Sequence, residues 1–358
     1  MEFTEWLERH GVAQALALGG LALGLLFGFM AQRSRFCLRA AVVEFWHDQF
    51  GTKLTVWLLT FSTAVIAIQV LLLAGWLDVS GTRQMANRGS LSGALVGGLC
   101  FGAGMIMTRG CASRLLVLSA NGNLRALLSG LIFAVTAQSA LSGALSPLRQ
   151  EIATWWTVEG GPSRDLLAVL GLGHEAGLAI GVVWAAAAVY FARHRLQGFW
   201  TWAGGIGVGL CVAMAWWDSY QVSQHTFDVV AVQGITFSGP SAEWLMRVLA
   251  PSPPPIGFDF GLLPGVFLGS FIAAWTRGEW KLEGFKDGYG MRRYIAGAVL
   301  MGFGAMLAGG CAVGAGVTGG AIFSMTAWLA LIGMWFGAGL VDRWMDPPLN
   351  SAPTWVQP

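Results

Sequence analysis

Nine long runs of apolar residues follow one another along this chain, separated by short stretches that hold most of its charges. They lie at residues 12–31, 54–77, 89–108, 126–148, 174–192, 199–217, 260–276, 294–308 and 321–341. A helix needs roughly 20 apolar residues to cross a bilayer, and backbone groups in lipid must be hydrogen-bonded within the spanning element. The pattern therefore predicts an all-α membrane protein with about nine transmembrane helices.

Composition excludes the common soluble classes. Hydrophobic residues make up 55% of the chain and charged residues 11%, whereas soluble domains carry about 25% charged residues. The net charge of +2 is too small to indicate nucleic-acid binding. The first residues include Glu2, Glu5 and Glu8 and no basic region, so we expect a retained first helix rather than a signal peptide.

Charges in the connections predict an orientation. The connection 277–293 holds five basic residues, 193–195 reads Arg-His-Arg, and 32–53 holds four basic residues, whereas 218–259 is mainly acidic. Basic connections favour the cytoplasmic side. With nine crossings of the inner membrane, we expect the N-terminus outside and the C-terminus in the cytoplasm. The connection 78–88, which has two arginines, is an exception on the outer side.

A self-match at an offset of 200 residues indicates an internal repeat. The matched positions are Gly102, Gly104, Gly110, Cys111 and Ala112 with Gly302, Gly304, Gly310, Cys311 and Ala312. The halves 12–148 and 199–341 would each contribute four crossings, and the region 149–198 one linking helix. One helix between two even repeats turns the second repeat over, which is a transporter architecture with its site where broken helices meet.

Both copies of the Gly-Cys motif are predicted to break a helix. Gly309 and Gly310 tolerate the backbone angles that a break requires. A helix that restarts there directs free N–H groups and partial positive charge at an anion. A charged residue in a membrane segment indicates function. We therefore expect Cys111 to reach the pathway from outside, Cys311 from inside, and an anion site at Arg109, Gly110, Arg114, Gly309 and Gly310.

The other cysteines are weaker candidates. An odd total of five, without paired spacing, argues against disulfides and metal sites. Cys100 and Cys211 lie within apolar runs that have no glycine break, which is typical of packing. Residues alone leave Cys37 open between packing and function, because its counterpart region near 216–218 lacks a cysteine.

Charged residues after the first crossing have ordinary interpretations. Arg33, Arg35 and Arg39 suit a cytoplasmic membrane edge. Glu44, His47 and Asp48 are expected to form a solvated interfacial cluster.

Three motifs resemble the YeeE/YedE family of sulfur-transport membrane proteins. They are Gln32-Arg-Ser-Arg-Phe-Cys37, residues 104–113 and residues 309–316, and they cover both halves. The resemblance implies an inverted-repeat transporter that takes up thiosulfate, with Cys111 toward the outside, Cys311 near the centre and Cys37 toward the cytoplasm. It also implies a small cytoplasmic sulfur-carrier protein of the TusA type as a partner. Arg114 departs from the small residue of many members.

The chemistry of thiosulfate leaves two mechanisms open. Its terminal sulfur is soft, so neutral thiols would offer weak contacts that release the ion readily, whereas a thiolate would attack it and form a persulfide. The first hypothesis is a permease, not an enzyme, without a P-loop, cofactor or metal. The alternatives are a membrane sulfurtransferase that feeds a cytoplasmic carrier, a transporter of a related sulfur or selenium anion, and a non-transporting partner in a sulfur-oxidation or selenium pathway.

Overall fold

The structure, a computed structural model, describes Leu7, Arg9 and residues 11–195, 198–251, 256–284 and 288–345. Within these residues nine helices are long and apolar enough to cross a membrane, which confirms the prediction of a multi-pass membrane protein. The long helices of these spans are α2 (Val12–Ser34), α4 (Thr52–Leu73), α6 (Leu91–Met107), α8 (Leu124–Ser142), α11 (His174–Arg195), α12 (Phe199–Gln224), α14 (Phe258–Trp275), α15 (Gly288–Leu307) and α16 (Met325–Met345). Three of the spans, Val12–Trp46, Leu91–Ala120 and Gly290–Gly319, also include the short helix that follows the long one. Glu2, Glu5, Glu8 and Lys286 lie outside the described residues.

Helix ends differ from the sequence prediction where backbone geometry ends a helix inside an apolar run. The run 126–148 ends early, because α8 stops at Ser142 and Pro147 sits in the first turn of α9 (Ser146–Thr154). The run 321–341 begins too early, because Phe323 has a φ of 54° and α16 starts at Met325. Hydrophobicity alone does not report such turns, since their residues are apolar too.

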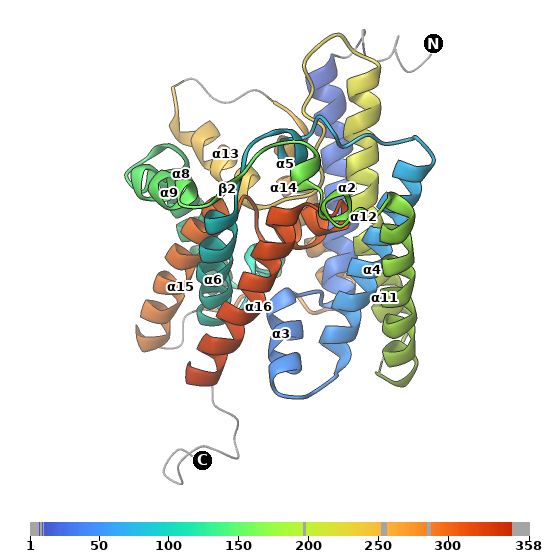
Figure 1. The fold of residues 1–358 in the computed structure, drawn as a ribbon. Helices are drawn as coiled ribbons and strands as arrows, with labels where there is room; N and C mark the ends of the chain where they lie inside the picture. Colours follow the sequence, from blue (N-terminus) through green and yellow to red (C-terminus); the bar gives the residue numbers. More distant parts are fainter. Residues whose placement is uncertain are drawn as a thin grey trace.

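Short elements cover one end of the bundle (Figure 1). They are α5 (Arg83–Ala86), α9, α10 (Leu166–Val169), α13 (Ser238–Leu249), the 3₁₀ turn η1 (Pro162–Arg164), and the strands β1 (Gly89–Ser90) and β2 (Thr157–Val158). The buried Arg164 links these short elements to one another and to α16. Its guanidinium donates to the carbonyl oxygens of Arg83 and Asn87, at 3.2 and 2.8 Å, and to the Thr326 hydroxyl.

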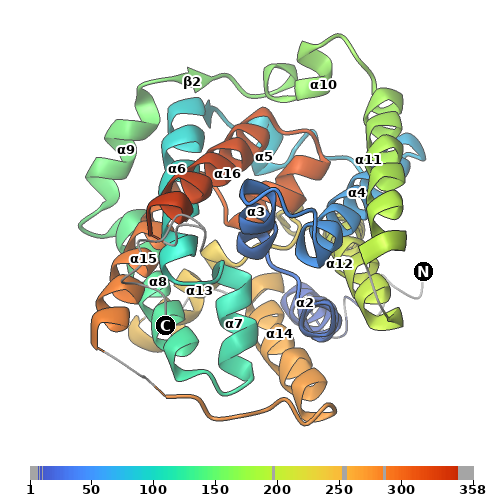
Figure 2. The ribbon, with the colours of Figure 1, turned by 90° about the horizontal axis from the view of Figure 1, so that it is seen from below.

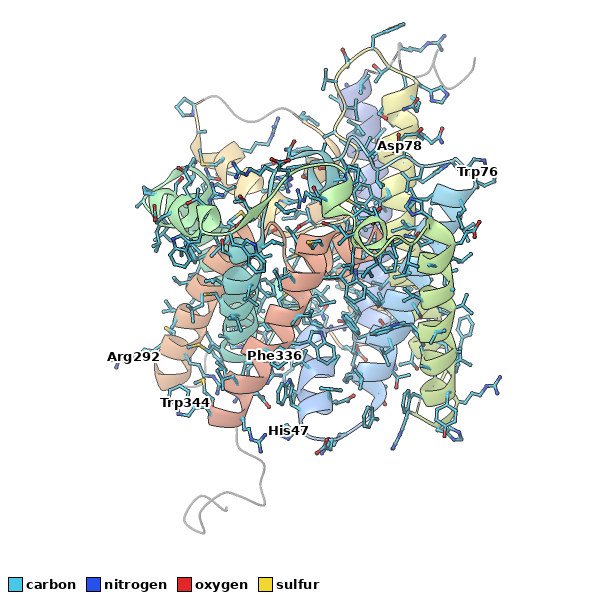
Figure 3. The ribbon with its side chains drawn as sticks, viewed as in Figure 1. His47, Trp76, Asp78, Arg292, Phe336 and Trp344 are labelled. Atoms are coloured by element: carbon cyan, nitrogen blue, oxygen red, sulfur yellow. The ribbon has the colours of Figure 1, made fainter. Side chains whose placement is uncertain are left out.

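Side chains labelled in Figure 3 mark the two ends of the helix bundle. Trp76 and Asp78 lie at the covered end, whereas His47, Arg292 and Trp344 lie at the opposite end, where α16 finishes. Trp76 and Trp344 are 63% and 82% exposed, as expected for aromatic residues at membrane–water interfaces. The basic connection before α15 is therefore on the side opposite the cover.

Glycines let the long helices approach closely. Gly20, Gly24 and Gly28 of α2 meet the carbonyls of residues 258, 262 and 266 on α14, and Gly261, Gly265 and Gly269 meet the carbonyls of residues 17, 21 and 25 in return. Small residues at such crossings permit backbone contact that a side chain would prevent. The four-residue glycine spacing is therefore a packing signal.

Helices α6 and α15 cross in a reciprocal way. A Cβ atom added at Gly97 would lie 2.7 Å from the Gly304 oxygen, and one added at Gly104 would lie 2.5 Å from the Gly297 oxygen. The two helices therefore run antiparallel, with the end of α6 beside the start of α15. Figure 2 shows this pair beside α16 and α8, whereas α11 lies at the periphery against α4.

Replacing Gly104 by Ala should destabilise the protein by about 1–3 kcal/mol, because the added methyl group would collide with the α15 backbone. We expect a lower Tm in detergent for Gly104→Ala. The matched control is Gly130→Ala on α8, where a Cβ would meet nothing within 4 Å. Equal Tm values for the two variants would contradict the packing described here.

Candidate functional site

Three helix breaks share one backbone design. A residue with left-handed backbone angles ends the helix two positions before each of three cysteines, and these residues are Arg35, Arg109 and Gly309, with φ of 54°, 56° and 78°. The N–H of the next residue donates to the carbonyl five positions back, at 3.1, 3.1 and 2.9 Å. This Schellman arrangement satisfies carbonyl groups that a helix end would otherwise leave unpaired.

Each of the three cysteines then begins a new short helix. Cys37, Cys111 and Cys311 are the N-cap residues of α3 (Leu38–Trp46), α7 (Ala112–Ala120) and the π-helix η2 (Ala312–Gly319), and all three are buried. The first N–H groups of a helix have no backbone partner and carry partial positive charge. Each thiol therefore lies at the positive end of a short helix, where an anion is favoured.

The first two thiols meet. The Cys37 and Cys111 side chains lie close enough to interact, and the Cys111 Sγ lies 3.4 Å from the Ser113 Oγ. Helix α7, which Cys111 begins, contacts α2, the helix that ends just before Cys37, and α3, which Cys37 begins, contacts α6. The expected order along a pathway, with Cys311 between the other two cysteines, stays a prediction.

Cys311 lies toward the other end of the α6–α15 pair. Cys111 follows the end of α6, beside the start of α15, whereas Cys311 follows the end of α15, where the Leu307 carbonyl faces Gly93 at the start of α6. The cover packs at this latter end, so Cys111 and Cys311 approach the core from opposite ends of the α6–α15 pair. Which of them faces the outer side stays a prediction. Helices α7 and η2 nevertheless contact each other, which brings both segments into one core.

The two candidate arginines near Cys111 have different surroundings. Arg109 contributes its left-handed backbone to the break, and its side chain is exposed. Arg114 is half-buried, its Nη1 lies 3.3 Å from the Gln32 Oε1, and its charge acts on the Cys37 and Cys111 thiols. Arg114 therefore supplies the positive charge next to this pair of thiols.

A polar network continues from Arg114 to the surface. Gln32, which is 6% exposed, donates from its Nε2 to the Glu279 Oε2 at 3.1 Å, and Glu279 pairs with Arg35 and Arg277 at 3.6 and 3.5 Å. Sequence reasoning missed Gln32 and Glu279 as members of the site. The signal for Gln32 was its place in the Gln32–Cys37 motif, whereas Glu279 lies about 240 residues away and gave none.

Cys311 has a different set of neighbours. Its Sγ accepts from the Gly314 N–H at 3.5 Å and lies 4.0 Å from the Thr236 Oγ1. Thr236 comes from the irregular segment before α13, and its hydroxyl is 3.3 Å from the Ser238 Oγ. The sequence did not single out either hydroxyl, because neither residue belongs to the repeated motif.

The remaining cysteines lie inside long helices. Cys211 is fully buried in α12, and Cys100 is partly exposed in α6, where it faces Gly304. Among the described residues no group of three or more His, Cys, Asp or Glu comes together as a metal site.

The prediction of a solvated cluster is wrong for Glu44 and His47, which have structural partners, whereas Asp48 is exposed as expected. The Glu44 carboxylate accepts from the Leu54 N–H at 2.9 Å and so caps the start of α4. His47 Nε2 lies 2.8 Å from the carboxylate of Asp342, a buried residue of α16. Both side chains have partners on other helices, which the sequence could not reveal. They hold α3 in place against its neighbours.

Oxidation should link Cys37 to Cys111, because their thiols are already in contact. We expect copper–phenanthroline treatment of the purified protein to give an intramolecular disulfide between the peptides that contain these residues, seen by mass spectrometry without reduction. Cys37→Ala should leave the Cys111 peptide unlinked. A link between Cys111 and Cys311 in place of the expected one would contradict the arrangement.

Comparison with known proteins identifies the family of this chain. The sequence pattern of the family described as Sulphur transport matches residues 33–340, which include all three capped breaks. The chain is 28% identical over 350 residues to a Spirochaeta thermophila protein named thiosulfate transporter TsuA, covering 90% of this chain and 98% of that protein. It is 26% identical over 353 residues to the Escherichia coli K12 protein of the same name, covering 91% and 95%. This chain therefore belongs to the Sulphur transport family of membrane proteins.

Proposed function

We propose that this protein takes up thiosulfate through a pathway lined by Cys37, Cys111 and Cys311, without being an enzyme. The two relatives named as thiosulfate transporters align over nine-tenths or more of both chains, and the family match over residues 33–340 includes the three cysteines. The observation that carries the proposal is the threefold use of one design, in which a capped helix end is followed by a buried cysteine at the start of a new helix.

The design suits a two-ended anion. Helix-start N–H groups favour the negative oxygens of thiosulfate, and a neutral thiol is a weak donor to its soft terminal sulfur. Weak contacts at successive sites allow an ion to leave as readily as it arrives. Arg114 adds charge on the side of Cys37 and Cys111, so the anion is favoured there over a neutral molecule.

We further propose that residues 12–148 and 199–341 are inverted repeats joined by the region 149–198, which contains α11. Reciprocal contacts support this. Gly97 and Gly104 meet Gly304 and Gly297, and these are the same two positions at an offset of 200. Gly102 packs on residues 334 and 338 of α16 as Gly302 packs on residues 133 and 137 of α8.

The orientation that fits the charges has the covered end outside the inner membrane and the C-terminus in the cytoplasm. The basic connection before α15 then lies inside, together with Cys37 and the exposed Arg35. A small cytoplasmic sulfur carrier of the TusA type would meet the protein on this basic side.

The contact between Cys37 and Cys111 also favours one second candidate, a sulfurtransferase. A thiolate beside Arg114 would attack the sulfane sulfur, break the S–S bond of thiosulfate, form a cysteine persulfide and release sulfite. Whole-ion transport and this reaction differ in which sulfur atom crosses.

Uptake with separately labelled sulfur atoms distinguishes the two. Cells that depend on this chain, or proteoliposomes that contain it, receive thiosulfate labelled in the sulfane or in the sulfonate sulfur. We expect both labels to enter at equal rates. Accumulation of the sulfane label alone, with labelled sulfite left outside, would refute the permease and support the sulfurtransferase.

Replacing Cys311 by Ala should lower the uptake rate at least about tenfold, because the substitution removes the thiol from one of the successive binding sites of the proposed pathway. The control is Cys211→Ala, which removes a buried thiol inside α12 and should leave uptake near that of the wild type. Both rates are normalised to the protein present in the membrane. Equal uptake by the two variants would remove Cys311 from the pathway.

A further inference from the structure

Helix α13 occupies the place in the second half that α3 occupies in the first. Helix α3 contacts α4, α6 and α16, whereas α13 contacts α14, α15 and α8. Under the proposed repeat these are corresponding helices. The counterpart of Cys37 is therefore to be found near the start of α13, and not near residues 216–218 where the sequence comparison placed it.

The local sequences agree with this correspondence. Phe36-Cys37 immediately precedes α3, and Phe237-Ser238 stands at the start of α13. The two phenylalanines are 3% and 1% exposed, and Cys37 and Ser238 are 7% and 3% exposed. Serine is the oxygen analogue of cysteine, so a hydroxyl stands in the second half where a thiol stands in the first.

The contacts of these two residues correspond as well. The Cys37 side chain interacts with that of Cys111, and Ser238 is linked to Cys311 through Thr236, with an Oγ–Oγ1 distance of 3.3 Å and an Oγ1–Sγ distance of 4.0 Å. Cys111 and Cys311 are themselves matched at the offset of 200. In each half, the N-cap cysteine, Cys111 or Cys311, is thus next to polar side chains at the start of the corresponding short helix, α3 or α13.

Hydrogen-bond accounting leaves capacity in this group. The hydroxyls of Thr236 and Ser238 and the thiol of Cys311 have three hydrogens to donate. Two contacts join these three groups, one between Thr236 and Ser238 and one between Thr236 and Cys311. Neither hydroxyl donates to a carbonyl oxygen of the described residues. By contrast the nearby Thr318 and Ser219 hydroxyls donate to the carbonyls of Ile235 and Gln233, at 2.6 and 2.8 Å.

The backbone around Cys311 is shaped to admit this hydroxyl. A Cβ atom added at Gly314 would collide with the Thr236 Oγ1, so only glycine leaves room there. The Gly314 N–H, which donates to the Cys311 Sγ at 3.5 Å, belongs to the first turn of η2. Hydroxyl, thiol and helix-start amide therefore converge on one buried place.

We propose that Thr236 and Ser238 bind the substrate anion beside Cys311, as the second-half counterpart of the Cys37–Cys111 site. The inference rests on the proposed thiosulfate uptake and adds to it two residues that contact the ion. The hydroxyls donate to oxygen atoms of the sulfonate end, while the Cys311 thiol faces the terminal sulfur. The two hydroxyls pair with oxygen atoms of a small sulfur oxyanion, so the site favours an anion that carries such oxygen atoms.

Initial rates of thiosulfate uptake into proteoliposomes test this site. Thr236→Val keeps the shape of the side chain and removes its hydroxyl, and Ser238→Ala does the same at the second position. We expect each change to raise the KM about fivefold to tenfold, which is the loss associated with one hydrogen bond of about 1–1.5 kcal/mol. Thr236→Ser should restore most of the affinity, because it returns the hydroxyl.

Two matched controls separate binding from folding. Ser241→Ala lies on the same helix as Ser238 but removes a hydroxyl that donates to the Phe237 carbonyl at 2.6 Å. Thr136→Val removes a buried hydroxyl that donates to the Ile132 carbonyl at 2.8 Å on α8. Both controls should keep the wild-type KM at normal amounts of folded protein, measured by gel filtration in detergent.

The outcomes distinguish this inference from the proposed function. If the wild type takes up no thiosulfate, the proposed function fails. If the wild type transports and the double variant Thr236→Val with Ser238→Ala keeps the wild-type KM, only the hydroxyl site fails. A tenfold rise in KM that Thr236→Ser reverses supports the site, because a merely structural hydroxyl would alter the amount of folded protein and not the affinity.

Discussion

A helix that stops inside a membrane protein leaves unpaired carbonyls at its end and unpaired N–H groups at the start of the next helix, and lipid offers neither group a partner. In this protein the first set is satisfied three times by a Schellman bond around Arg35, Arg109 or Gly309. The unpaired N–H groups at the start of the next helix lie beside a buried cysteine in each case. The capped breaks therefore produce both a stable fold and three places where an anion is the natural partner. Every functional statement above depends on them.

Close packing of the long helices makes these breaks possible. Glycine faces on α2, α6, α14 and α15 bring backbones together, so the segments that break are surrounded by protein rather than by lipid. The same packing sets which cysteines meet. Because α7 packs on α2 and α3 packs on α6, Cys37 lies close to Cys111, while Cys311 follows α15 toward the other end. Interhelical contact, and not the order of residues along the chain, decides which cysteines are neighbours.

The sequence predicted what depends on local composition and missed what depends on distant contacts. Nine apolar runs gave nine helices, because hydrophobicity over about 20 residues is a strong local signal. The breaks near Cys111 and Cys311 were visible in their glycines, yet the left-handed Arg35 was not, since arginine seldom adopts that conformation. Glu44 and His47 were misjudged because their partners, Leu54 and Asp342, come from other helices. Thr236 was missed because 75 residues separate it from Cys311.

The two proposed binding places differ in chemistry, and the difference has a physical consequence. The place near Cys37 has two thiols, a hydroxyl and the charge of Arg114, whereas the side-chain polar neighbours of the Cys311 thiol among the described residues are two hydroxyls. Neutral hydroxyls release a dianion more readily than a guanidinium does, because charge-assisted hydrogen bonds are about twice as strong as neutral ones. An ion that moves from the hydroxyl side to the arginine side therefore moves toward stronger binding. In the proposed orientation that direction is inward, which agrees with uptake.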